Sequence, residues 1–311
     1  MDLIYQYHQV FRVMKNIIIN SLVILFITSC ETIDGPYLTD TNNNDNPSTS
    51  TKKVLIEDFT GHLCPNCPDA ARELEAIHNV YGDQIIAMAI HVTKSFAKPY
   101  PLSQAPKFQY DFRTQWGDNW DSFFGISSIG LPRGMVNRIG YTNGDHALGK
   151  NEWLSIVQNE LDKTPDFKID ISSNITSNNN GSIDVSTTVL NNISGSYNLI
   201  VCLTENNITN WQKDGSIEDE NYVHNHVLRS VLFDDQLANT NNYTYQNVHQ
   251  NIINFDIEAL EQYNINYSTN IAEQGNGNAG EWEVNNLSII AYIYNTTNYE
   301  IIQVEEIYLI N

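Results

Sequence analysis

The sequence predicts an α/β domain followed by an all-β sandwich domain. Residues 52–164 open with a strand, a helix and a second strand, whereas residues 165–311 lose helical periodicity and alternate in short runs. A chain of 311 residues is long enough for two domains of ordinary size. Cys64 and Cys67 are separated by two residues at the first strand-to-helix junction, where we expect the chemistry to lie.

The chain is strongly acidic, with 16 Lys and Arg against 37 Asp and Glu and a formal net charge of −21. A nucleic-acid partner requires basic surface that neutralises phosphates, and anionic lipid attracts the same side chains. The composition therefore excludes nucleic acid as a partner.

Residues 1–29 have the pattern of a signal peptide whose true start is Met14. Lys15 supplies the positive charge, an apolar run follows, and small residues precede Cys30. A run of about 11 apolar residues is too short to span ~30 Å of hydrocarbon. The segment resembles a bacterial lipoprotein signal, which implies cleavage before Cys30 and lipid on its sulfur. The alternative is a buried N-terminal hydrophobic helix with an incidental cysteine.

Residues 30–51 are predicted to hold the lipidated Cys30 and a flexible tether. The stretch TDTNNNDNPSTSTKK has no apolar side chain to bury. Several acyl chains on one cysteine make a lasting anchor, so the membrane is a partner through this lipid. We therefore expect an outer membrane lipoprotein of a bacterial cell envelope, on the periplasmic or the surface face.

Residues 52–164 begin with the apolar run VLIEDF, which predicts a buried strand. From Pro68 onward apolar residues recur at three- and four-residue intervals, as in an amphipathic helix, and Gly82 ends this pattern. The run QIIAMAIHV then predicts a strand that is covered on both faces. Cys64 therefore lies at or just before a helix N-terminus in a βαβ unit.

Cys64 and Cys67 could form a redox pair, half of a metal site or a structural staple. A zinc site needs two or more further ligands, but Cys30 is assigned to lipid and Cys202 lies in a distant apolar run. We therefore expect no metal site and no cofactor. A redox pair needs only a helix N-terminus that stabilises a thiolate and a second nearby thiol, and the spacing supplies both.

The same region resembles the thioredoxin superfamily. Asp58 stands where that family carries a buried acid six residues before the first cysteine, and the Leu131-Pro132 step matches its cis-proline. The resemblance implies that Cys64 attacks a disulfide, that Cys67 resolves the product and that Asp58 manages the proton of the second thiol. It also implies that Pro132 shapes a peptide groove in which the backbone of Leu131 contacts substrate.

The rest of the first domain includes an aromatic insertion at about residues 94–128. We interpret it as a helical excursion that buries its own rings; the alternative is an aromatic lid in which Trp116 and Trp120 bind substrate. Asn143-Gly144 predicts a hairpin turn, and residues 151–163 predict a last helix.

Three motifs also resemble a narrower family, the envelope lipoproteins related to the twenty-eight-kilodalton outer membrane protein. They are Phe59-Thr60-Gly61, then Cys64-Pro65-Asn66-Cys67-Pro68, and Asn137-Arg138. The resemblance implies a second, β-rich domain after the first.

Residues 165–311 contain several short alternating runs separated by Asn, Gly and Ser, a pattern typical of an immunoglobulin-like β-sandwich. Cys202 within LIVCL predicts a buried, reduced thiol. His224 and His226 fall on one strand face and predict a polar surface patch or a hydrogen-bonded pair, with a metal site as the less favoured alternative. The run FDIEALEQYNI fits either a helix or an extended segment.

Two functions follow from these patterns. The first is thiol-disulfide exchange on the thiols or disulfides of envelope proteins, by an oxidoreductase that uses Cys64 and Cys67. The alternative is a non-catalytic surface binding or adhesion lipoprotein in which the same two cysteines form a permanent structural disulfide.

Overall fold

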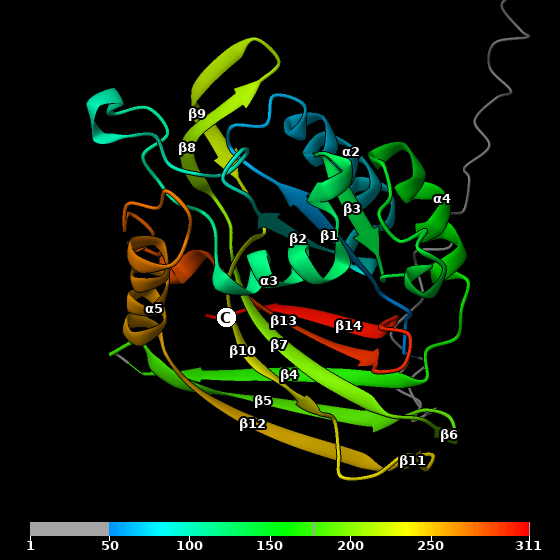
Figure 1. The fold of residues 1–311 in the computed structure, drawn as a ribbon. Helices are drawn as coiled ribbons and strands as arrows, with labels where there is room; N and C mark the ends of the chain where they lie inside the picture. The colour runs from blue at the N-terminus through cyan, green and yellow to red at the C-terminus, as the bar shows by residue number, and fades with distance from the viewer. Residues whose placement is uncertain (1–49, 177, 311) are drawn as a thin grey trace, which may run out of the picture. The chain divides into compact units, whose positions relative to one another are not determined.

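The computed structural model describes residues 50–176 and 178–310 (Figure 1). The predicted signal peptide, Cys30 and nearly all of the predicted tether lie outside these residues. The described residues form one compact unit. Within the described part, no helix combines the length and the apolar character that crossing a membrane requires.

The first half of this unit is a mixed α/β structure. Its elements are β1 (Val54–Thr60), α2 (Cys67–Tyr81), β2 (Ile85–His91), α3 (Gln115–Phe124), β3 (Arg133–Val136) and α4 (Lys150–Leu161). Strand β1 is parallel to β2 and antiparallel to β3. The predicted strand, helix and strand around the two cysteines are therefore confirmed.

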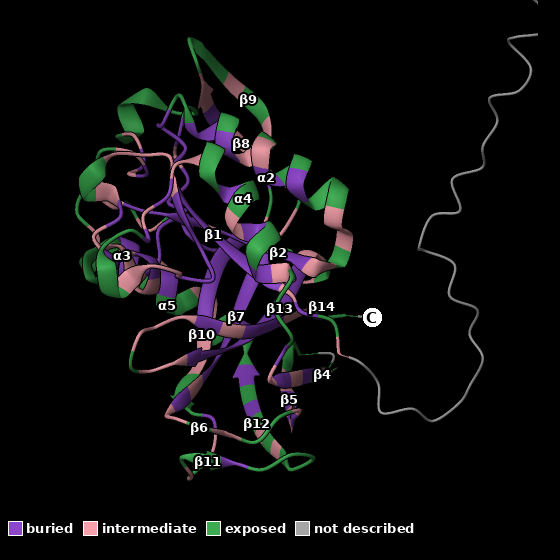
Figure 2. Cartoon of the chain, turned by 90° about the vertical axis from the view of Figure 1, so that its right-hand side faces the viewer, coloured by how far each residue is buried: buried purple, intermediate pink, exposed green. Residues whose placement is uncertain are grey.

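The helices of this half cover both faces of its strands. Alternate β1 residues Val54 and Ile56 pack with α2 and α4, whereas Leu55 and Phe59 pack in the cluster that receives α3. Figure 2 shows these central strands buried along their length, while the helices are buried on one side and exposed on the other. This arrangement explains the continuous apolar runs of β1 and β2, since each strand is covered on two sides.

The prediction of a hairpin at Asn143-Gly144 is wrong. Residues Tyr141–Asn143 form a short 3-10 turn, with Gly140 and Gly144 on either side in the left-handed region. In the described chain β3 has no hairpin partner beyond a single bridge between Gly134 and Leu148. The Asn-Gly step supplied the positive φ expected of a turn, but the turn closes a helical segment instead of joining two strands.

The second half is rich in β-structure. Its strands are β4 (Phe167–Ile175), β5 (Asn180–Val189), β6 (Ile193–Ser194), β7 (Tyr197–Glu205), β8 (Ile208–Asp214), β9 (Ile217–His224), β10 (Val227–Gln236), β11 (Asn242–Tyr243), β12 (Val248–Asp256), β13 (Leu287–Asn295) and β14 (Ile301–Tyr308). The segment that the sequence left undecided is a helix, α5 (Ile257–Asn270), which Asp256 caps by accepting from the Ala259 N–H.

Two layers of strands face each other in this half. Strands β12, β5 and β4 form one layer, and β14, β13, β7 and β10 belong to the other. Apolar side chains of both layers meet in one core, among them Phe167 and Val185 from the first layer and Leu203 and Ile289 from the second. The alternating burial along β5 follows from this arrangement, because only one face of the strand meets the other layer.

One seven-stranded sheet runs through both halves, in the order β14-β13-β7-β10-β2-β1-β3. The two halves meet where Val227 of β10 pairs with Ala89 of β2, and the Ala89 N–H donates to the His226 carbonyl at 2.8 Å. Met88, Cys202 and Tyr292 share one buried cluster across this junction. The predicted domain boundary lies in the loop between α4 and β4, and the seven-stranded sheet takes strands from the chain both before and after that loop.

Candidate functional site

The two cysteines form a disulfide at the start of α2, with 5.4 Å between their Cα atoms. Cys67 is the first residue of the helix, and Pro68 is tolerated after it because first-turn N–H groups have no intrahelical acceptor. The Cys64 N–H donates to Gly61, and the Cys67 N–H donates to Cys64. Both cysteines are buried, with 1% and 2% of their surface exposed.

Asp58 lies on β1 next to this disulfide and is almost fully buried. Its Oδ1 has no hydrogen-bond partner among the described residues. Burial raises the pKa of the Asp58 carboxyl well above its ordinary value, so the acid keeps its proton to a higher pH than an exposed aspartate does and is a stronger base once ionised. A neutral carboxyl group can donate a proton, which an ionised one cannot.

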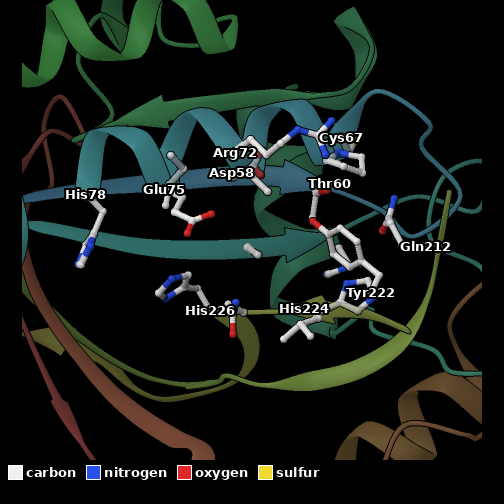
Figure 3. A pocket seen from close by; sticks show the side chains of 17 residues that line it. Asp58, Thr60, Cys67, Arg72, Glu75, His78, Gln212, Tyr222, His224 and His226 are labelled. Carbon is white, nitrogen blue, oxygen red and sulfur yellow. The ribbon is translucent and has the colours of Figure 1, made fainter. Parts of the chain in front are cut away.

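Asp58 and Cys67 line one cavity of about 470 Å³. Helix α2 forms one wall, β2 forms the floor, and the end of β9 with its turn into β10 forms the other wall (Figure 3). The acid and the second cysteine of the predicted site are therefore brought to the same space.

Pro132 lies on the other side of the cysteine loop. The Leu131–Pro132 peptide bond is cis, and Pro132 lines a shallow surface hollow together with Leu131 and Asn66, the residue before Cys67. Strand β3 starts directly after this proline and pairs with β1, so that Gly134 stands opposite Asp58. The register of β1 and β3 thus brings the proline loop to the cysteine loop.

Trp116 and Trp120 are placed elsewhere. Both lie on α3, where they are half-buried against the core cluster on the face of the sheet opposite α2. The Trp120 ring lies 5.6 Å from the guanidinium carbon of Arg138, which is buried. Neither tryptophan lines the cavity beside Cys67 or the hollow beside Pro132.

The β8–β9 hairpin of the second half covers the cysteine loop. The Lys213 N–H donates to the His62 carbonyl at 2.9 Å, and the Gly215 N–H donates to the Pro65 carbonyl at 2.8 Å. Gln212 adds a bond from its side-chain amide to the Cys64 carbonyl at 3.1 Å. Sequence reasoning missed this cover because no local pattern tells which distant backbone a hairpin will meet.

Several buried histidines surround the same region. His91 of β2 stacks on Phe112 at 4.7 Å between ring centroids, and the His224 ring lies 4.6 Å from the same phenylalanine. Burial lowers the pKa of His62 to about 4 and that of His224 to about 3, so both are neutral at neutral pH.

The prediction of a polar surface patch at His224 and His226 is wrong. His224 is buried, and His226 occupies the turn after β9 with a φ of 58°. The turn folds against β2, so the two side chains line the cavity instead of a surface. Within the described residues, no group of three or more His, Cys, Asp or Glu is arranged to hold a metal ion.

Cys202 is confirmed as a buried thiol. It lies in β7 with none of its surface exposed and takes no part in a disulfide of the described chain. Burial raises the pKa of this thiol well above its ordinary value, which keeps it protonated and unreactive.

Comparison with solved structures places this fold among known ones. HBP35 of Porphyromonas gingivalis is 15% identical and has a TM-score of 0.54, over 84% of this chain and 76% of that one, which indicates a shared fold. A protein from Agrobacterium tumefaciens is 10% identical with a TM-score of 0.46, over 84% and 96% of the two chains. A domain of the outer membrane lipoprotein Omp28 from P. gingivalis is 16% identical with a TM-score of 0.27, over 47% and 88%.

No curated protein matches this sequence. Residues 118–309, more than half of the chain, match the family described as outer membrane protein Omp28. The match begins within α3 and continues almost to the C-terminus, so it covers the cis-proline segment and the β-rich half. The chain therefore belongs to the Omp28 family and is an outer membrane lipoprotein of the cell envelope, as its sequence predicted.

Proposed function

We propose that this protein exchanges disulfides with envelope proteins through Cys64 and Cys67, while lipid on Cys30 anchors it to the membrane. The proposal treats the first half as thioredoxin-like and the β-rich half as an immunoglobulin-like sandwich. The βαβ unit, the cis-proline before β3 and the two facing β-layers support these assignments.

The observation that carries the proposal is the state of Asp58. A buried carboxyl oxygen without a hydrogen-bond partner costs free energy, and Asp58 Oδ1 is such an oxygen among the described residues. A permanent disulfide needs no acid beside it. An exchanging pair does, because the thiol of Cys67 must lose a proton before it can attack, and Asp58 lines the same cavity as Cys67.

The chemistry follows from the reduced form of the pair. The Cys64 thiolate, stabilised near the α2 N-terminus, attacks one sulfur of a partner disulfide and displaces the other as a thiolate. Cys67 then passes its proton to the ionised form of the Asp58 carboxyl, attacks the sulfur of Cys64 and displaces the partner's second sulfur as a thiolate. Asp58 and solvent each return a proton to the two partner thiolates. The products are the Cys64–Cys67 disulfide and a partner with two thiols. The hollow beside Pro132 is the proposed place for the partner's backbone, with Leu131 as its contact.

Access to Cys64 requires movement of the β8–β9 hairpin. With 1% of Cys64 exposed, a protein disulfide cannot reach its sulfur while Gln212 and Gly215 hold the loop. The proposed substrate role of Trp116 and Trp120 would require a partner large enough to reach α3 as well.

The experiment that tests this function is covalent trapping. The Cys67→Ser variant of the full-length protein, expressed in its own host, should accumulate mixed disulfides with envelope proteins through Cys64. Non-reducing gels and mass spectrometry would identify them. The Cys64→Ser,Cys67→Ser double variant is the matched control and should give none. If the single variant forms no adduct above this control, exchange is refuted.

A second candidate function is favoured by the burial of both sulfurs. In that case the disulfide is a structural staple under the hairpin, and the lipoprotein serves in binding or adhesion. A structural disulfide has a reduction potential below about −300 mV, whereas a working pair lies above that value. Equilibration of the protein with dithiothreitol buffers would distinguish the two.

A further inference from the structure

Three aromatic side chains from distant parts of the chain form a cluster at the surface, the aromatic patch. They are Phe123 in α3, Tyr141 in the 3-10 turn after β3, and Tyr299 in the turn between β13 and β14. Their ring centroids lie 5.0 to 5.8 Å apart in all three pairs. Phe123 is 50% exposed, and the two tyrosines are half-buried. Large apolar side chains that gather at a surface mark a place of contact.

The backbone at Tyr299 is held in an unfavourable conformation. Its φ of 63° lies in the left-handed region, where bulky side chains are rare and where Gly or Asn would fit with less strain. The Tyr299 ring stacks on Tyr294 at 6.0 Å and contacts Phe123, so the turn presents this ring at the patch. Strained residues of this kind are concentrated at functional sites.

The patch is fixed by the core behind it. The buried Phe124 ring lies 4.9 Å from Phe123 and 5.4 Å from Tyr141. The guanidinium carbon of Arg138 lies 4.8 Å from the Phe124 ring, and Glu57 holds this guanidinium in a buried ion pair. A surface that is already ordered loses little conformational entropy when it binds.

The start of the described chain lies beside the patch. The Gln303 side chain donates to the Thr51 carbonyl at 3.0 Å and accepts from the Lys53 N–H at 3.1 Å. Gln303 follows Tyr299 by four residues, so their Cα atoms are at most about 14 Å apart. The segment that precedes Thr51 therefore leaves the folded part near the patch.

The predicted tether is short compared with the folded part. Residues 31–50 join Cys30 to Thr51, and random-coil scaling gives them an r.m.s. reach of about 25 Å. A compact unit of about 260 residues is about 45 Å across. The lipid proposed on Cys30 thus keeps the side with the aromatic patch near the membrane, where a high effective concentration favours even a weak contact.

The charges near the patch in the sequence select the kind of surface that it fits. Asp121, Asp145 and Glu300 are at least partly exposed, whereas Arg138 is buried and paired with Glu57. Anionic lipid would be repelled by these acids. A second copy would bring the same acids together, and each chain has a net charge of −21. A zwitterionic lipid surface carries no net charge and avoids both costs.

We propose that the aromatic patch docks onto a zwitterionic lipid surface and fixes the orientation of the tethered protein. Tyrosine and phenylalanine suit this place, because their rings meet the acyl chains while the tyrosine hydroxyl stays in water. The inference rests on the lipid anchor at Cys30, which is part of the proposed function, and does not depend on disulfide exchange.

The test places a fluorescent reporter in the patch of the lipidated full-length protein, reconstituted in phosphatidylcholine vesicles. Tyr299→Trp is the reporter. Tyr308→Trp, at an exposed position at the far end of β14, is the matched control. Fluorescence is compared between ordinary lipid and lipid brominated on its acyl chains, after subtraction of the signal of the unmodified protein. Since docked side chains reach about 5–10 Å into the headgroup boundary, brominated lipid should quench the reporter at least about twofold and leave the control unchanged.

A second substitution tests whether the ring cluster itself makes the contact. Phe123→Asn, added to the Tyr299→Trp protein, removes the most exposed ring of the patch and should lower the quenching toward that of the Tyr308→Trp control. Leu102→Asn changes a side chain outside the patch that is 79% exposed and should leave the quenching as it was. If Tyr299→Trp does not fold, Tyr141→Trp reports on the same cluster.

Flotation with the vesicles separates failure of the anchor from failure of docking. Protein that does not float has no lipid anchor, and that result overturns both. Floating protein whose patch reporter and control are quenched equally overturns docking alone. So does a patch reporter that neither brominated lipid nor aqueous iodide quenches, since protein would then cover the patch. Stronger quenching in anionic phosphatidylglycerol than in phosphatidylcholine would contradict the zwitterionic partner.

Discussion

Gln212 of β8 donates a hydrogen bond to the carbonyl of Cys64 at 3.1 Å, although 148 residues separate the two in the sequence. This bond joins the β-rich half of the chain to the loop of the first half that holds the Cys64–Cys67 disulfide. Two backbone bonds, from Lys213 to His62 and from Gly215 to Pro65, extend the same contact. The environment of the cysteines is thus set by both halves.

Loosening the hairpin should expose the disulfide. Gly215→Pro removes the N–H that donates to Pro65, and proline cannot adopt the φ of 58° found there. We expect dithiothreitol to reduce the Cys64–Cys67 disulfide about tenfold faster in this variant, as measured by alkylation and mass spectrometry. Gly215→Asn keeps both the N–H and a tolerated positive φ and should react at nearly the original rate. Equal rates in the two variants would show that the hairpin does not limit access.

Removal of the buried acid should stabilise the protein at neutral pH. The pKa of Asp58 is raised in the folded state, so above pH 3.8 the unfolded chain releases a proton that the folded protein keeps. Stability is therefore lost as pH rises. Asp58→Asn should increase the free energy of unfolding at pH 7, because asparagine stays neutral in both states at no cost.

The gain from Asp58→Asn should shrink as the pH falls and disappear below pH 3.8, where the carboxyl is protonated in the unfolded chain as well as in the folded protein. Urea unfolding at a series of pH values measures this profile. Asp83→Asn, at an exposed position, serves as the comparison. A gain that is the same at every pH would mean that ionisation of Asp58 is not its cause.

The buried histidines should destabilise the fold in acid. Since burial lowers the pKa of His224 to about 3, the unfolded chain takes up a proton below about pH 6.5 that the folded protein does not. Stability should fall between pH 6.5 and about pH 3. His224→Gln should reduce this fall by about 3 kcal/mol between pH 7 and pH 4. His78→Gln, on the exposed side of α2, is the control; a parallel decline in both variants would contradict the assignment.

The ion pair between Glu57 and Arg138 should be costly to break. Both side chains are buried and joined by two hydrogen bonds of 2.9 and 2.6 Å, and the guanidinium also donates to the hydroxyl of Tyr292 on β13. Glu57→Gln should lower the free energy of unfolding by about 3–5 kcal/mol, because the buried guanidinium loses its counter-charge. Denaturant unfolding would measure the loss.

The matched comparison for that pair is Asp69→Asn, which removes one partner of the exposed Arg72. Its cost should stay below about 1 kcal/mol, as is usual for surface ion pairs. If both substitutions had similar small effects, Arg138 would not depend on Glu57 for its burial.

The elements around the cysteines were predictable because their signals are local. The helical spacing after Pro68 and the apolar runs of β1 and β2 depend only on neighbouring residues, and each was confirmed. The prediction of a hairpin at Asn143-Gly144 failed because a positive φ occurs both in hairpin turns and at the ends of helical segments. The alternation of side chains along a strand predicts which face His224 lies on, but it does not predict whether another element covers that face.

The sequence by itself determined the family, the βαβ unit with its two cysteines at a helix start, and a β-rich second half. Only the tertiary structure decided that β10 joins β2 in one sheet, that the β8–β9 hairpin covers Cys64, and that Asp58 shares a cavity with His224. The spacing of apolar residues shows which side of a helix or strand is apolar, and this depends on only a few neighbouring residues. Which distant element fills that side depends on the packing of the whole chain, and that packing leaves no local mark.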